Sequence, residues 1–199
     1  MTKLDTYQKL ILAAYNCFAE KGYAATSVKE IAKRAGISQG AMYTYFQGKE
    51  ELFIAIVHEE QRIALSVYEE KFAGSNLERI YEVMFRYCLT NSKFYPANHN
   101  HIWLEIMAES SRNDILRDSF IKSDIVLRQG IHNFITNGVK AGEFPSNVNL
   151  DRATIVVFSL IDGLMARKAI NPAFDIEKDL PGFKETLKAI ICSSASSPS

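Results

Sequence analysis

The chain has 199 residues with 23 basic and 23 acidic side chains, so its formal net charge is zero and gives no indication of nucleic-acid binding. Hydrophobic residues make up 47% of the sequence and charged residues 23%, a composition typical of folded globular proteins rather than disordered ones. The longest stretch without Asp, Glu, Lys or Arg is the 14 residues from Ala35 to Gly48. A membrane-spanning helix needs roughly 18 or more apolar residues, so no membrane association is expected.

Cysteine and histidine usage gives no sign of a disulfide framework or a metal site. The three cysteines are odd in number and far apart, unlike a disulfide set or a zinc ligand set. His99, His101 and Glu105 have weak metal-ligand character, with His101 and Glu105 one helical turn apart, but no fourth ligand lies near them, and a solvated loop is the favoured interpretation. The N-terminal residues are charged and include no apolar segment, so no signal peptide is expected. We therefore expect a cytoplasmic protein without a metal or another cofactor.

Apolar residues recur with the 3.6-residue period of an α-helix in nearly every segment, beginning with a helix that ends at Gly22. No segment of four or more residues alternates cleanly between apolar and polar side chains. The later helices are expected from about Gly48 to Phe72, around residues 77–88, 102–107 and 116–135, and from about Leu150 to Ile170 and Asp175 to Cys192. The sequence thus predicts an all-α fold of about nine helices, with a disordered Ser-rich tail at residues 193–199.

Residues 27–49 carry the pattern of two short helices joined by a tight turn. Ser27 and Glu30, three residues apart, form a capping box, which predicts a helix that begins directly after Ser27. Gly36 is expected to end this helix, and Ser38 to cap a second one after a turn of three to four residues. This arrangement is that of a helix-turn-helix.

The second of these helices has an outward face without acidic side chains. Met42 and Phe46, one turn apart, are expected to point into the core. The other residues are small or able to form hydrogen bonds: Gln39, Gly40, Ala41, Tyr43, Thr44 and Tyr45. Such a face suits close approach to the phosphates and base edges of a DNA groove, and Lys49 follows where a charge can reach a phosphate. The alternative is an ordinary helical corner with solvated polar residues.

Four segments in the first third of the chain extend this motif. They read ILAAYNCF at residues 11–18, GY at 22–23, TSVKEIAKRAGIS at 26–38 and GAMYTYFQGKEEL at 40–52. Together they resemble the N-terminal domain of the TetR family of transcriptional regulators, in order and without gaps, over roughly residues 7–57. The remaining two thirds resembles the family only in helix count, chain length and the Asp-Gly-Leu step at residues 162–164.

The resemblance implies a homodimeric repressor that binds double-stranded operator DNA and is released by a small-molecule effector. Matched position by position, the family's phosphate contacts fall on Ser27, Tyr43 and Lys49. Its base contacts fall on Lys29, Gln39, Gly40, Ala41, Thr44 and Tyr45, with Ser38 at the start of the same helix. Many members carry Pro or another residue where this chain has Gly40, which has no side chain to offer. Direct readout is therefore expected to rest mainly on Lys29, Gln39, Thr44 and Tyr45.

The charge distribution supports this interpretation once the chain is divided. Residues 1–50, the expected DNA-binding domain, hold seven basic and four acidic side chains, a net charge of +3. Residues 51–199, the expected ligand-binding and dimerisation domain, hold 16 basic and 19 acidic side chains, a net charge of −3. A basic head on an acidic body is expected to steer DNA to one end of the molecule.

The effector is expected to bind an apolar cavity in the body, lined by aromatic, Met and Ile side chains at helical spacing. The candidates are Tyr81, Met84, Phe85, Trp103, Ile106, Met107 and Phe120. Such a cavity suits an apolar or aromatic ligand, and Asp162, Arg86, Glu105 and Glu109 are the ionisable groups able to orient it. Core packing is the alternative for the apolar residues. For Asp162, the alternatives are pairing across a dimer or with a neighbouring helix end.

The last two long helices are expected to form the dimer interface, where Gly163 indicates close helix approach. The candidate contacts are Phe158, Leu160, Leu164, Phe183, Leu187 and Ile191. Two other functions remain open beside the ligand-responsive repressor. One is a small-molecule-binding protein with a TetR-like fold whose head no longer reads DNA, and the other is a DNA-binding protein regulated by another protein. No sequence pattern of an enzyme is found, so catalysis is not expected.

Overall fold

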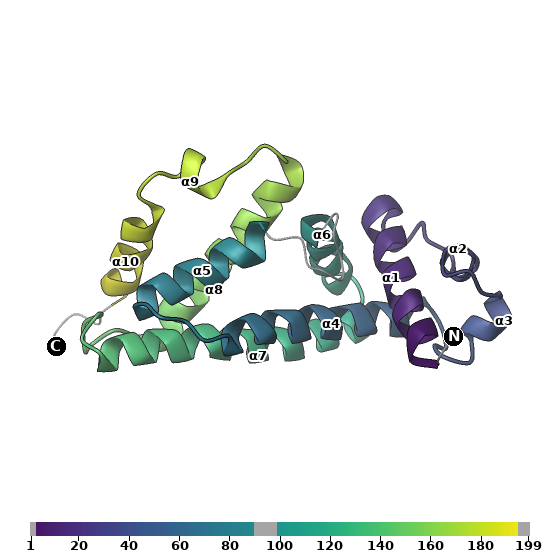
Figure 1. Cartoon of the computed structure of the whole chain (residues 1–199), viewed down its shortest axis with the longest axis horizontal. Helices are drawn as coiled ribbons and strands as arrows, with labels where there is room; N and C mark the ends of the chain where they lie inside the picture. The colour runs from purple at the N-terminus through teal and green to yellow at the C-terminus, as the bar shows by residue number, and fades with distance from the viewer. Residues whose placement is uncertain (1–2, 90–98, 195–199) are drawn as a thin grey trace. The chain divides into compact units, whose positions relative to one another are not determined.

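The computed structural model describes residues 3–89 and 99–194, and these residues form ten helices and no strand (Figure 1). The helices are α1 (Lys3–Lys21), α2 (Val28–Arg34), α3 (Gln39–Met42), α4 (Lys49–Glu69), α5 (Asn76–Leu89), α6 (His99–Ser110), α7 (Asp114–Lys140), α8 (Leu150–Ile170), α9 (Ile176–Asp179) and α10 (Phe183–Ser193). The all-α prediction is confirmed, and the extra helix is the single turn of α9. Residues 195–199 of the predicted tail lie outside the described residues. No helix in the described ranges is long and apolar enough to cross a membrane.

Packing divides the chain into two compact units. The first comprises residues 1–63 and 91–123, and so contains α1 to α3, most of α4, α6 and the start of α7. The second comprises residues 64–90 and 124–199, and so contains α5, most of α7 and the helices α8 to α10. The predicted boundary at residue 50 separates a DNA-binding domain from a ligand-binding and dimerisation domain by function rather than by packing, and it stays a prediction.

The core of the first unit joins the N-terminal helices to α6. Tyr15 and Phe18 of α1 and Phe53 of α4 are almost completely buried. Ile102 and Ile106 of α6 belong to the same buried cluster, and α6 lies against α1 (Figure 1). Removing a large apolar side chain from water contributes roughly 1.5–3 kcal/mol. Helix α6 is therefore part of the structure that supports the helix-turn-helix.

In the second unit, α8 packs against α5, and α10 packs against both of these helices. Helix α8 has the predicted bounds, and the Asn149 side chain caps it by accepting a hydrogen bond from the Arg152 N–H at 2.9 Å. Leu187 and Ile191 of α10 are completely buried. The three helices thus form the core of this unit.

The prediction of one helix from Asp175 to Cys192 is wrong. Helix α9 ends at Asp179 and α10 begins at Phe183. Between them, Pro181 has no N–H to continue the helical hydrogen bonds, and Gly182 adopts a left-handed conformation with φ of 75°. The sequence carried this signal in its adjacent Pro and Gly, but the apolar periodicity on both sides concealed the break.

A buried arginine closes the C-terminal end of α4. Arg79 of α5 is 5% exposed, and its Nη2 donates hydrogen bonds to the carbonyl oxygens of Val67 and Glu70 at 2.6 and 2.7 Å. Its guanidinium carbon also lies 5.1 Å from the centre of the Phe72 ring. The last carbonyl groups of a helix have no partner within it, so Arg79 satisfies them and anchors α4 to α5.

Candidate nucleic-acid interface

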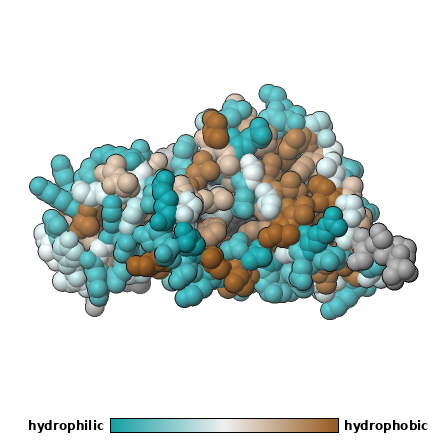
Figure 2. All heavy atoms as spheres, turned by 180° about the vertical axis from the view of Figure 1, so that it is seen from behind, coloured by the Kyte–Doolittle hydropathy of each residue, from teal (hydrophilic) through white to brown (hydrophobic). Residues whose placement is uncertain are grey.

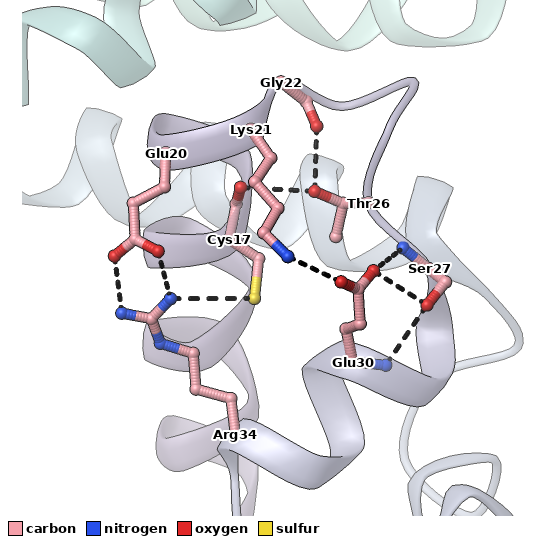
Figure 3. A network of polar contacts seen from close by, with 8 residues as sticks. All are labelled: Cys17, Glu20, Lys21, Gly22, Thr26, Ser27, Glu30 and Arg34. Carbon is pink, nitrogen blue, oxygen red and sulfur yellow. Dashed lines mark hydrogen bonds and ion pairs between the residues drawn. The ribbon is translucent and has the colours of Figure 1, made fainter.

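Helix α2 begins with the predicted capping box, which is confirmed (Figure 3). Ser27 Oγ accepts a hydrogen bond from the Glu30 N–H at 3.2 Å, and the Glu30 carboxylate accepts one from the Ser27 N–H at 3.0 Å. Lys21 of α1 forms an ion pair with Glu30 at 2.7 Å. The hydrogen bonds from Lys21 and then from Ser27 lower the pKa of Glu30 to about 2. The start of α2 is thus fixed both to its own backbone and to α1.

A second contact joins α1 to α2 at the other end of α2. The Arg34 guanidinium donates two hydrogen bonds to the Glu20 carboxylate, both of 2.6 Å (Figure 3). Both side chains are about 40% exposed, so the pair contributes roughly 1 kcal/mol or less. Burial raises the pKa of the neighbouring Cys17 thiol, which keeps it protonated and unreactive near neutral pH.

The turn after α2 depends on the glycine at position 36. Gly36 has φ of 73°, a left-handed conformation that is strained for other residues. Ile37 N–H then donates back to the Ala32 carbonyl at 3.0 Å, which closes the end of α2. Ile37 also packs against the core of the first unit. The turn therefore has both the bond and the apolar contact that the helix-turn-helix needs.

Helix α3 is held by one cap and two buried anchors. Ser38 Oγ accepts a hydrogen bond from the Ala41 N–H at 3.1 Å. Met42 and Phe46 are buried at 0% and 4% exposure, as predicted from their spacing. The regular helix ends at Met42, and the next residues continue as a turn in which Thr44 Oγ1 donates to the Ala41 carbonyl at 2.7 Å. Thr and Tyr lose side-chain freedom in a helix, consistent with this early end.

The residues predicted to contact DNA form a largely exposed surface on α2, α3 and the turn that follows. Ser27, Lys29, Ser38, Gln39, Gly40, Tyr43 and Thr44 are exposed, and Ala41, Tyr45 and Lys49 are half-buried. Tyr43 is 49% exposed, so its ring and hydroxyl group are accessible to a partner molecule. A Cβ added at Gly40 would meet no other atom within 4 Å, so the surface is open there.

Lys49 has intramolecular partners that the sequence did not predict. Its Nζ donates to the carbonyl oxygens of Tyr23, Ala24 and Thr26 at 2.9, 3.4 and 3.2 Å. It also lies 4.4 Å from the centre of the Tyr23 ring. An ammonium group has three donors, so a phosphate contact requires Lys49 to share or exchange one of these bonds. Carbonyl groups are common to every residue type, so no sequence signal could have identified these partners.

Four of the predicted effector-binding residues lie in the first unit. The rings of Trp103 and Phe120 are paired, with centres 5.7 Å apart. Ile106 is buried in the core cluster, whereas Met107 is 37% exposed. This aromatic pair is consistent with core packing as well as with one wall of a cavity, and the effector role stays a prediction.

The other four predicted effector-binding residues lie in the second unit. Tyr81 and Phe85 stack with ring centres 6.2 Å apart, and Met84 is completely buried. Asp162 is largely buried, and its Oδ1 accepts no hydrogen bond within the described part of the chain. Burial, and then the negative charge of Asp124, raise the pKa of Asp162 to about 6. Asp162 is thus a carboxyl group with an unsatisfied hydrogen-bonding atom.

Most of the predicted dimer contacts are already buried within one chain. Phe158 and Leu164 are 5% and 7% exposed, and Leu187 and Ile191 are completely buried. These four side chains therefore pack within the second unit, and their role at a dimer interface stays a prediction. Leu160 and Phe183 are half-buried and retain some surface.

A different apolar surface lies on the outward side of α8 and along the segment after it. Ile155 and Ile170 are 46% and 79% exposed. A groove of about 650 Å³ lies beside Ile170, lined by Gly163, Ala166, Arg167, Ile170, Asn171, Phe174, Asp179 and Leu180. Figure 2 shows apolar side chains gathered on one face of this unit, over the region of α8 to α10. Periodicity identified α8 as apolar on several sides but could not distinguish its inner side from its outer one.

Two family models match the chain. Residues 10–56 match the model described as bacterial regulatory proteins of the tetR family, and residues 83–181 match the C-terminal domain of BetI-type transcriptional repressors. Among curated relatives, the probable regulator ArpR of Pseudomonas putida is 24% identical over 206 residues, covering 92% of this chain and 89% of that protein.

Solved structures share the fold over nearly the whole chain. GusR of Salmonella enterica superposes with a TM-score of 0.80 at 24% identity, covering 98% of this chain and 97% of that one. FadR of Bacillus subtilis, solved in complex with stearoyl-CoA, superposes with a TM-score of 0.77 at 22% identity, covering 96% and 100%. The chain belongs to the TetR family of transcriptional regulators, which bind DNA through an N-terminal helix-turn-helix and are not enzymes.

Proposed function

We propose that the chain is a repressor that binds operator DNA as a homodimer and leaves it when an apolar or aromatic small molecule binds. The observation that carries the DNA-binding role is the exposed, acid-free surface around α3, with Gln39, Tyr43 and Thr44 facing solvent. Repression is supported by the match of residues 83–181 to a repressor family.

Each part of this surface has a proposed role on DNA. Ser27, at the start of α2, and Tyr43 contact phosphates, which set the position of the head without reading sequence. Gln39 and Lys29 reach base edges in the major groove, where Gln pairs well with adenine and Lys with guanine. The net charge of +3 on residues 1–50 supports steering of this end toward DNA.

A homodimer supplies the second recognition helix. Two half-sites of an operator lie about 34–36 Å apart, so a dimer must hold its two heads at that spacing. We place the dimer contact on the outward side of α8, where Ile155 and Ile170 are exposed and Gly163 allows close approach. Leu160 and Phe183 are retained from the predicted set because part of each side chain is still accessible.

The proposed effector is apolar or aromatic. Within the first unit, the paired rings of Trp103 and Phe120 offer aromatic contact area to such a ligand. Within the second unit, the rings of Tyr81 and Phe85 are a separate candidate for the same role. The relative FadR, whose structure contains stearoyl-CoA, supports a ligand with a large apolar part. Asp162 is proposed to orient a polar or cationic end of such a ligand, because its Oδ1 has no hydrogen bond among the described residues.

Capture of genomic DNA fragments on the purified protein tests this function directly. The preferred fragment, labelled with a fluorophore, is then titrated with protein and compared with a scrambled fragment of equal length. A specific regulator is expected to prefer its site by roughly 10³-fold or more. Capture of no preferred fragment would favour a small-molecule binder whose head does not read DNA. A preferred fragment that no member of an apolar ligand panel releases would favour regulation by a protein.

A further inference from the structure

The loop between α1 and α2, residues 22–26, is held by a side chain from far along the sequence. The Glu105 carboxylate of α6 accepts a hydrogen bond from the backbone N–H of Tyr23. The same carboxylate oxygen lies 3.3 Å from the position of a Cβ added at Gly22, whose φ is 82°. The left-handed conformation of Gly22 ends α1, after which the Tyr23 N–H meets Glu105 instead of a carbonyl of its own helix.

The opposite side of this loop is held by α4. Lys49 binds the carbonyl of Tyr23 at 2.9 Å, so the residue whose N–H contacts Glu105 has its carbonyl bound by Lys49. The Tyr23 side chain is 7% exposed and packs edge-on against Phe53, with ring centres 5.3 Å apart. Tyr23 is therefore fixed through its amide, its carbonyl and its ring.

Glu105 is well placed to set the position of the loop because its own helix is rigidly packed. Ile102 and Ile106, on either side of it in α6, lie in the core cluster of the first unit. A hydrogen bond from an amide to a charged carboxylate is shorter and stronger than one between neutral groups. Four residues after Tyr23, the chain reaches Ser27, which begins α2 and is a proposed phosphate contact.

From this geometry we propose that Glu105 is a positioning residue for DNA binding. It ties the α1–α2 loop to α6 and thereby places the start of α2 where Ser27 meets the DNA backbone. The inference rests on the proposed DNA-binding function, and it makes α6 part of the DNA-binding machinery although α6 does not touch DNA. The sequence also offers Glu105 as a group able to orient an effector, and that role stays a prediction beside the bond to Tyr23.

Two substitutions of Glu105 separate the effect of its hydrogen bond to Tyr23 from the effect of its charge. Glu105→Ala removes the acceptor, whereas Glu105→Gln keeps an acceptor oxygen and removes the charge. Asp118→Ala is the control, because it removes the same charge from an exposed position of the same unit. Hydrogen exchange at the Tyr23 amide, followed by NMR, reports the bond without any DNA. Fluorescence anisotropy with the preferred fragment reports DNA binding.

Glu105→Ala is expected to speed exchange of the Tyr23 amide and to weaken binding to the preferred fragment, each by roughly tenfold. Glu105→Gln is expected to keep most of the protection of the Tyr23 amide and most of the DNA affinity. Asp118→Ala is expected to change neither the amide exchange nor the affinity. Unchanged exchange in Glu105→Ala would overturn the contact. An affinity loss in Glu105→Gln as large as in Glu105→Ala, or a wild-type affinity in Glu105→Ala, would overturn the positioning role. Failure of the wild-type protein to prefer any fragment would instead overturn the proposed function. The two failures can be distinguished because the exchange of the Tyr23 amide is measured without DNA.

Discussion

Replacement of Lys49 by Met tests whether this residue stabilises the head in the absence of DNA. Its hydrogen bonds to the carbonyls of Tyr23 and Thr26 are partly buried, whereas the bond to Ala24 is long and exposed. A hydrogen bond to a charged group contributes about 1.5–3 kcal/mol, and an ammonium that is still partly solvated beside an aromatic ring contributes about 0.5–1 kcal/mol. Ordering a Lys side chain costs up to about 2 kcal/mol. The lower ends of these ranges suit a half-buried group, so the Lys49→Met substitution is expected to reduce the free energy of unfolding by about 2 kcal/mol.

Thermal unfolding followed by circular dichroism measures this loss. For a chain of this size, a loss of about 2 kcal/mol lowers the Tm by roughly 4–8 °C. Lys33→Met is the matched control, because Lys33 is exposed on α2 and carries the same charge. A Lys49→Met protein with the Tm of wild type would refute the structural role derived from the three carbonyl contacts.

Salt dependence of DNA binding separates this structural role from a phosphate contact. Loss of a phosphate contact reduces the slope of log K against log salt concentration by about one. A Lys49→Met protein that melts early but keeps the wild-type slope would assign Lys49 to the loop alone. A reduced slope would show that the ammonium also reaches the DNA backbone.

Three other predictions concern DNA readout, pH dependence and dimerisation. Tyr43→Ala is expected to weaken binding to all DNA sequences, whereas Gln39→Ala reduces only the preference for the specific fragment; equal losses on specific and random DNA would contradict the assignment of Gln39. The raised pKa of Asp162, about 6 when folded against 3.8 ordinarily, means that the folded state loses stability as pH rises from about 4 through 6. The free energy of unfolding of Asp162→Asn, measured in urea, is therefore expected to match that of wild type near pH 4 and to exceed it at pH 7.5 by up to about 3 kcal/mol. An equal difference between the two proteins at both pH values would contradict this prediction. Ile170→Glu is expected to sediment as a monomer, whereas Ile115→Glu, at a position of the first unit that is also exposed, stays dimeric; a dimeric Ile170→Glu would move the interface elsewhere.

Local signals in the sequence were sufficient for the helix-turn-helix. The capping box of Ser27 and Glu30 acts over three residues, and the left-handed turn at Gly36 depends on one residue type, so both could be predicted and both are found. The burial of Met42 and Phe46 follows from their spacing of one turn. In these cases the residues that determine the structure are neighbours in the sequence.

Contacts between distant parts of the chain could not be predicted in the same way. Glu105 and Tyr23 are 82 residues apart, and the group that Glu105 binds is a backbone amide with no residue-specific signal. The outward side of α8 could not be identified from the sequence for a related reason. Periodicity marks apolar positions, but it does not distinguish Leu187 of α10, which is covered within the chain, from Ile170 of α8, which remains exposed.

The shared core of α6 and the N-terminal helices has a consequence for engineering hybrid regulators. A chimera joined at residue 50 would place the foreign side chains of another protein against Tyr15 and Phe18, where Ile102 and Ile106 pack in this chain. Each mismatch in such a core costs roughly 1–3 kcal/mol through overpacking, or more where a cavity forms. Transfer of DNA specificity should therefore move residues 1–63 together with residues 91–123, two separate stretches of sequence that fold as one module.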